Sequence, residues 1–237
     1  MNCYLFIDFG STYTKVTLVD IQKEEIVATG KSYTTVETDV INGYKAALEK
    51  MFSKIDYEVN IVKKLACSSA AGGLKIIAIG LVPELTAEAA KRAALGAGAR
   101  VIKTYSHNLN RSEISEIKNS KADMILLAGG TDGGNNICIN HNAMIIAEYG
   151  IDIPVVVAGN KSCNDEIADI FNDKIEFYIT ENVMPNLNTI NVEPARETIR
   201  NIFMKQIVHA NGMEHVEESI SGILMPTPAS VLKAAEA

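Results

Sequence analysis

Residues 8–15 combine an aspartate, a glycine, several hydroxyl side chains and a lysine in one short stretch, Asp-Phe-Gly-Ser-Thr-Tyr-Thr-Lys. The glycine lets the backbone approach a ligand closely, and successive N–H groups and hydroxyls can wrap a phosphate. Asp8 can hold Mg²⁺ through water, since Mg²⁺ keeps much of its hydration shell, and Lys15 can offset phosphate charge. An ordinary hairpin with a hydroxyl-rich turn is the alternative interpretation. The candidate phosphate contacts are Asp8, Gly10, Ser11, Thr12, Thr14 and Lys15.

Strands are expected on both sides of this turn. Residues 2–8 and 14–20 are rich in apolar, β-favouring side chains. Because only residues 9–13 separate them, the two strands must be antiparallel neighbours. Residues 26–35 predict a third strand, and the apolar spacing over residues 41–55 predicts a helix.

The pattern changes after residue 70, where short apolar runs alternate with helical stretches. A continuous apolar run is typical of a buried parallel strand, and the alternation predicts βαβ units around a parallel sheet. A proline at residue 83 suits the first turn of a helix. The expected strands cover residues 74–82, 100–105, 124–128, 154–158 and 176–180, and the expected helices cover residues 83–97, 112–119, 136–149, 165–171 and 193–208.

The segment at residues 8–15 resembles the first phosphate-binding hairpin of the actin-like ATPase superfamily, and the chain has no GxxxxGK[ST] phosphate loop. The resemblance implies ribonuclease H-like domains with ATP and Mg²⁺ in the cleft between them. Asp8 would then lie near the metal, and residues 10–12 would line the β- and γ-phosphates. The expected fold class is α/β. The expected domains are the start of an actin-like ATPase domain at residues 1–65, a three-layer α/β domain with a parallel sheet at residues 66–215, and a return segment towards the ATPase domain at residues 216–237.

Two later stretches narrow the resemblance to one family. Residues 68–74 (Ser-Ser-Ala-Ala-Gly-Gly-Leu) run into residues 80–94 (Gly-Leu-Val-Pro-Glu-Leu-Thr-Ala-Glu-Ala-Ala-Lys-Arg-Ala-Ala), and residues 127–135 read Leu-Ala-Gly-Gly-Thr-Asp-Gly-Gly-Asn. With the hairpin, they resemble the accessory-protein family of adenosylcobalamin-dependent glutamate mutase, which is unrelated to DNA mismatch repair. The resemblance implies an ATP-dependent, chaperone-like reactivating factor. Its partner would be the mutase, whose damaged cobalamin it helps to exchange.

Two other functions of the same superfamily stay open. A sugar or carboxylate kinase needs a catalytic aspartate close to the substrate hydroxyl, and a filament-forming actin relative needs two complete lobes. No catalytic residue is assigned for any of the three. The superfamily's second phosphate loop and adenosine-binding segment are expected downstream of residue 237. The chain is therefore interpreted as an N-terminal portion that binds ATP weakly by itself.

A second glycine-rich turn, at residues 129–135, stands between an expected strand and an expected helix. Such a turn can present N–H groups to an anion, and ligands favour the carboxyl ends of strands in open α/β sheets. Gly130, Asp132 and Gly133 are therefore further candidate contacts to the cofactor, another ligand or a partner, with a tight strand-to-helix connection as the alternative. Residues 68–73 are interpreted as a joint or a binding loop, and residues 159–162 as an N-cap turn or a weak phosphate loop.

Composition and charge exclude several classes of protein. The chain has 237 residues, of which 47% are hydrophobic, enough to bury a sizeable core. A net charge of -7 disfavours non-specific nucleic-acid binding. The longest apolar runs are too short to span a membrane, and no signal-peptide pattern opens the chain, so we expect a cytoplasmic protein. Its histidines lack metal-binding spacing. Its cysteines lack CxxC spacing and are all expected as small core residues: Cys3, Cys67, Cys138 and Cys163.

Overall fold

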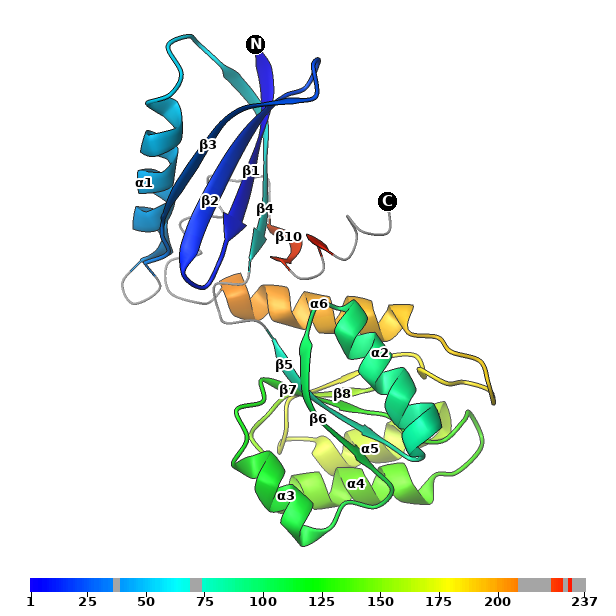
Figure 1. Ribbon diagram of the computed structural model, residues 1–237. Helices are drawn as coiled ribbons and strands as arrows, with labels where there is room; N and C mark the ends of the chain where they lie inside the picture. Colours follow the sequence, from blue (N-terminus) through cyan, green and yellow to red (C-terminus); the bar gives the residue numbers. More distant parts are fainter. Residues whose placement is uncertain (36–38, 69–73, 209–222, 228–229, 232–237) are drawn as a thin grey trace. The chain divides into compact units, whose positions relative to one another are not determined.

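The computed structural model describes the chain except for residues 36–38, 69–73, 209–222, 228–229 and 232–237 (Figure 1). The chain divides into two compact units. The first comprises residues 1–73 and 202–237, and the second comprises residues 74–201. The domain boundaries expected from the sequence were after residues 65 and 215, whereas the two units meet after residues 73 and 201. Each unit is built around its own five-stranded sheet.

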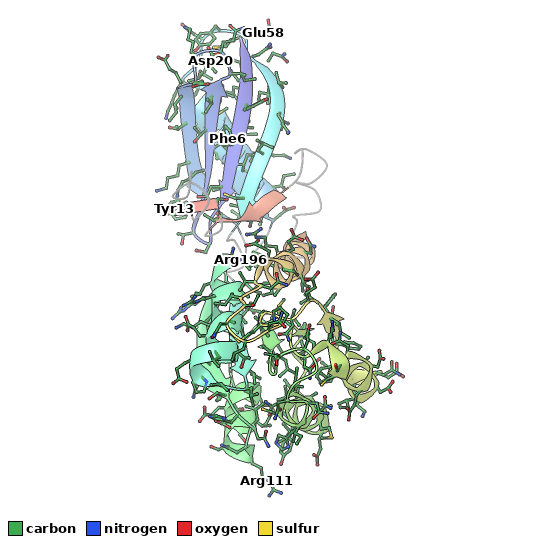
Figure 2. The ribbon with its side chains drawn as sticks, turned by 90° about the vertical axis from the view of Figure 1, so that its right-hand side faces the viewer. Phe6, Tyr13, Asp20, Glu58, Arg111 and Arg196 are labelled. Carbon is green, nitrogen blue, oxygen red and sulfur yellow. The ribbon has the colours of Figure 1, made fainter. Side chains whose placement is uncertain are left out.

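The first unit contains a mixed sheet with the strand order β10-β4-β1-β2-β3. β2 runs antiparallel to both β1 and β3, whereas β4 runs parallel to β1, and β10 runs parallel to β4. The elements are β1 (Asn2–Phe9), β2 (Tyr13–Asp20), β3 (Glu25–Tyr33), α1 (Val40–Phe52), β4 (Asn60–Ser68) and β10 (Ile223–Pro226). Figure 2 shows Tyr13 and Asp20 at opposite ends of β2.

Helix α1 covers one face of this sheet and packs against β2 and β3. The alternating pattern of β1 buries every second side chain, as expected for a strand with one covered face. Gly30 permits the close approach of the helix, because a Cβ atom there would lie 2.0 Å from the carbonyl oxygen of Ala47. The core residues of this face include Cys3, Leu5, Ile7, Phe9, Val16, Leu18, Tyr44, Ala47 and Met51.

The second unit contains a fully parallel sheet with the strand order β6-β5-β7-β8-β9. The parallel sheet and the α/β class expected from the sequence are confirmed. The strands are β5 (Lys75–Gly80), β6 (Arg100–Ser106), β7 (Met124–Leu127), β8 (Val155–Val157) and β9 (Phe177–Ile179). The helical elements are η1 (Pro83–Ala87), α2 (Glu88–Gly96), α3 (Arg111–Lys118), α4 (Ile137–Glu148), η2 (Lys161–Cys163), α5 (Asn164–Phe171) and α6 (Glu193–Val208), of which residues 193–201 belong to this unit.

Both faces of the parallel sheet are covered, which makes this unit three-layered. Helices α3, α4 and α5 lie on one face, and α2 lies on the other (Figure 1). The strands β5 and β7 are accordingly buried almost throughout, as expected for parallel strands between two helical layers. Among the described helices, none is both long and apolar enough to cross a membrane.

Three features differ from the sequence prediction. No strand was predicted at β4 or β10. A register shift between Cys3 and Tyr4 breaks the alternation of β4, where Val62 is exposed beside Lys63. The single helix expected over residues 83–97 begins instead as the π-helical turn η1. In this turn the Ala87 N–H donates to the carbonyl of Val82, five residues earlier, and Thr86 Oγ1 accepts hydrogen bonds from the backbone N–H groups of residues 81 and 82.

Candidate functional site

Asp8 and Lys15 face each other across the first hairpin. They are paired residues in the antiparallel register of β1 and β2, so their side chains leave the sheet on the same face. Lys15 Nζ lies 3.3 Å from Asp8 Oδ2, and the side chains are 56% and 27% exposed, respectively. The pair is open to solvent, so the ammonium group is free to exchange between the carboxylate and an incoming anion.

The turn between the two strands is tight and presents its tip to solvent. The Gly10 N–H donates to the carbonyl of Tyr13 at 3.1 Å, and a Cβ at position 10 would lie 2.7 Å from that same oxygen. This close approach explains why glycine stands there. Ser11 and Thr12 are exposed, so their hydroxyls are accessible at the end of the hairpin.

Thr14 has a different position from the one expected. It is fully buried, and its Oγ1 shares a hydrogen bond of 3.0 Å with Thr34 Oγ1. The Thr34 N–H also donates to the carbonyl of Thr12 at 2.9 Å. The buried Thr14 hydroxyl therefore connects β2 to Thr34 and does not face solvent, so we leave Thr14 out of the proposed phosphate contacts.

Two further neighbours of Asp8 were not predicted from the sequence. Thr227 Oγ1 donates to Asp8 Oδ1 at 3.0 Å and lies 3.5 Å from Cys67 Sγ. The Cys67 thiol in turn lies 3.7 Å from Asp8 Oδ1. The parallel register of β1, β4 and β10 brings these groups together at the carboxyl ends of three adjacent strands. We call Asp8, Lys15, Cys67 and Thr227 the Asp8 cluster.

Cys67 was expected in the core, but it is only partly buried and belongs to this cluster. Burial raises the pKa of the Cys67 thiol above its ordinary value, and the hydrogen bond from Thr227 partly offsets this. The thiol therefore stays protonated near neutral pH and can donate its S–H to Asp8. The other three cysteines are buried, as expected.

The glycine-rich turn after β7 is tied to neighbouring segments by three of its backbone N–H groups. The Asp132 N–H donates to the carbonyl of Pro185, the Gly133 N–H donates to Asn160 Oδ1, and the N–H of the next residue donates to the carbonyl of residue 131. The carbonyl of Gly130 accepts from the buried Asn182 amide at 3.0 Å. Because the N–H groups of Asp132 and Gly133 have partners within the fold and the Asp132 carboxylate would repel a phosphate, we leave Gly130, Asp132 and Gly133 out of the proposed phosphate contacts.

The remaining candidates have local structural roles. Asn160 Oδ1 accepts from the Ser162 N–H at 3.0 Å, which matches the N-cap interpretation of residues 159–162. Ser68 Oγ donates to the carbonyl of Phe9 at 3.5 Å, and residues 69–73 lie outside the described residues. His141 Nε2 lies 3.2 Å from the carbonyl oxygen of residue 109. Among the residues that the structure describes, no group of three or more His, Cys, Asp or Glu side chains could hold a metal ion.

Comparison with known proteins decides the family. Residues 4–237 match the family described as MutL protein. The chain belongs to the MutL protein family. This MutL family, which the three sequence motifs resemble, is the accessory family of glutamate mutase and not the mismatch-repair family of the same name. Protein MutL of Clostridium tetanomorphum is 65% identical over 237 residues, which cover 99% of this chain and 51% of that relative.

The chain thus spans about half the length of the curated MutL relative it matches. Two solved structures show weaker likeness. A glycerol dehydratase reactivase is 16% identical with a TM-score of 0.23, covering 74% of this chain and 30% of that one. An activator of the 2-hydroxyisocaproyl-CoA dehydratase from Clostridium difficile, with bound ADPNP, is 15% identical with a TM-score of 0.23. The match covers 88% of this chain and 98% of that one. At these scores, neither structure adds to the argument from the site.

Proposed function

We propose that this chain carries the nucleotide-binding hairpin of an ATP-dependent, chaperone-like accessory factor for adenosylcobalamin-dependent glutamate mutase. Membership of the MutL family supports the partner. The Asp8 cluster supports the nucleotide and is the observation that carries the proposal. It holds one carboxylate at a strand end, beside an exposed turn of hydroxyl residues.

The residues of the hairpin fit Mg²⁺ and a nucleotide phosphate. Mg²⁺ is usually bound by one or two carboxylates together with phosphate oxygens and water, and Asp8 offers one partly exposed carboxylate. Ser11 and Thr12 offer exposed hydroxyls at the tip of the turn. Lys15 is more exposed than the carboxylate it pairs with, so it can turn towards a phosphate without leaving a buried charge behind.

Each residue of the cluster has a distinct part in this proposal. Asp8 holds the hydrated metal, and Lys15 neutralises phosphate charge. Thr227 and Cys67 act as positioning residues, because their hydrogen bonds fix the Asp8 carboxylate on the side away from Lys15. ATP, when bound, supplies the free energy of phosphate transfer to water. We propose that this energy is used to release damaged cobalamin from the mutase.

The proposal places the factor in the cytoplasm with the mutase subunits as its partners. All four cysteines are free thiols, as is usual in a reducing compartment. The acidic balance of the chain, with a net charge of -7, gives no support to a nucleic-acid partner. The protein partner is therefore the one to test.

A pull-down of the mutase subunits by the full-length protein tests the proposal. Wild type, Asp8→Ala and a control, Glu25→Gln, are compared with and without Mg-ATP. Glu25 is exposed at the start of β3 and pairs with Asp20, at the far end of β2 from the hairpin turn. We expect nucleotide-dependent capture by wild type and the control, and its loss in Asp8→Ala. Capture in no nucleotide state would instead favour a small-molecule kinase.

A further inference from the structure

A cavity of about 660 Å³ opens in the second unit, and none of its lining residues belongs to the Asp8 cluster. Its walls come from the segments that follow β7, β8 and β9 and from the start of α6, so it lies at the carboxyl ends of parallel strands. Ligands of open α/β sheets bind at such edges, and the volume lies within the range of about 300–1,000 Å³ for small-molecule sites. The lining residues that matter to its chemistry are Asp132, Lys161, Glu181, Asn182, Asn191 and Glu197.

The walls of this cavity are held by a buried amide. Asn182 is 3% exposed, and its Nδ2 donates to Asp132 Oδ1 at 2.9 Å as well as to the carbonyl of Gly130. Its Oδ1 accepts from the Met184 N–H at 2.9 Å. The backbone N–H of Lys161 also donates to Asp132 Oδ1, at 3.1 Å. Asn182 thus ties the loop after β9 to the loop after β7, and the Asp132 carboxylate ties both to the loop after β8, so hydrogen bonds within the fold hold the walls of the cavity.

The charge of the cavity selects against anions. Three carboxylates, on Asp132, Glu181 and Glu197, stand against the one ammonium group of Lys161, leaving a formal charge of -2. The Lys161 ammonium is already 3.8 Å from Asp132 Oδ2. A phosphate would meet net repulsion, whereas a neutral or cationic ligand with many N–H or O–H donors would find acceptors.

Side-chain amides make up much of the remaining lining. Four asparagines contribute, at positions 164, 182, 191 and 201. A carboxamide both donates and accepts, so it pairs with another carboxamide or with a carboxylate; Asn191 Nδ2 and Glu181 Oε2 show such a pair at 2.9 Å. The amide and carboxylate groups of the cavity are therefore suited to a ligand that carries carboxamides and no net negative charge.

We propose that this cavity binds the carboxamide side chains at one edge of a corrin ring, so that the accessory factor contacts cobalamin directly. This rests on the proposed function, which brings the protein to a cobalamin-containing mutase. The whole corrinoid is larger than the cavity, so the rest of the ring stays outside it. The net negative charge of the lining would admit the neutral carboxamide edge of a corrinoid and repel the phosphates of a nucleotide.

The test is equilibrium dialysis of cyanocobalamin against the full-length protein, read from the absorbance of the corrin. The variants are Glu197→Ala and Asn201→Ala, which change exposed residues on α6, and the control is Glu148→Ala on α4, outside the cavity. Because each variant removes one hydrogen-bonding side chain, each should weaken binding by roughly three- to tenfold. The control and Asp8→Ala should bind cyanocobalamin like wild type.

Two results would overturn this inference: no retention of cyanocobalamin by wild type, or equal retention by wild type and both rim variants. The mutase pull-down separates this failure from that of the proposed function. Nucleotide-dependent capture of the mutase without cyanocobalamin binding rejects the cavity alone. Cyanocobalamin binding that depends on Glu197 and Asn201, without capture of the mutase, rejects the proposed partner and keeps the cavity.

Discussion

The hydrogen bond from Thr227 to Asp8 links residues 219 positions apart, and its removal makes the sharpest test of the cluster. Thr227→Val keeps the shape of the side chain and deletes only the donor. Hydrogen bonds to charged groups contribute about 1.5–3 kcal/mol. The Asp8 side chain is 27% exposed, and water then competes for the carboxylate. We therefore expect a loss of about 1 kcal/mol, or a roughly fivefold rise in local opening.

The assay is a double-mutant cycle of Thr227→Val with Asp8→Ala, read by hydrogen exchange of peptides from β1 and β4. Exchange is resolved by segment, so the two compact units need not unfold together. The two substitutions should be non-additive by about 1 kcal/mol, since either one removes the same bond. Thr227→Ser, which keeps the hydroxyl, should resemble wild type. Effects that add within about 0.3 kcal/mol would show that Thr227 and Asp8 do not stabilise the fold through a shared hydrogen bond.

Three further predictions concern stability and reactivity. Gly30→Ala should destabilise the first unit by about 1–3 kcal/mol, because its Cβ would overlap the carbonyl of Ala47; unchanged exchange in α1 peptides would contradict this. Asn110→Ala should cost about 1 kcal/mol, since it removes the capping box that Asn110 forms with Glu113 at the start of α3, and exchange in α3 peptides measures it. Cys67 should react with iodoacetamide more slowly than a free cysteine at pH 8, because burial raises its pKa and the thiolate is the reactive form. Its reaction rate should therefore still rise with pH above the ordinary thiol pKa of 9.0. Mass spectrometry of the labelled peptide measures this rate, and a rate that levels off below pH 9.0 would contradict the prediction.

The elements that positioned the hairpin could be predicted because their signals are local. The alternation of apolar residues in β1 and β2 is regular, and Gly10 stands where the turn must be tight. The parallel sheet of the second unit could also be predicted from the sequence, since its strands are apolar and alternate with helical stretches. These features depend on near neighbours in the chain, which sequence patterns report well.

The missing parts depend on contacts between distant segments. Nothing near Thr227 in the sequence indicates that it meets Asp8. Their contact requires β10 to pair with β4, and the residues of the whole second unit separate these strands in the chain. A lone cysteine in a sequence is usually interpreted as a core residue. Cys67 belongs to the cluster only because the parallel register of β1 and β4 pairs it with Asp8. The role of Asn182 at the cavity likewise arises from two loops, after β7 and after β9, that are distant in the chain and that the fold brings together.

The central claim is that the Asp8 hairpin binds Mg-nucleotide, and isothermal titration of Mg-ATP into the full-length protein tests it most directly. Wild type, Asp8→Ala and the control Glu25→Gln are titrated under the same conditions. We expect saturable binding by wild type and the control, and at least tenfold weaker binding by Asp8→Ala, a difference of about 1.4 kcal/mol. Equal affinity for all three proteins, or no binding by any of them, would contradict it.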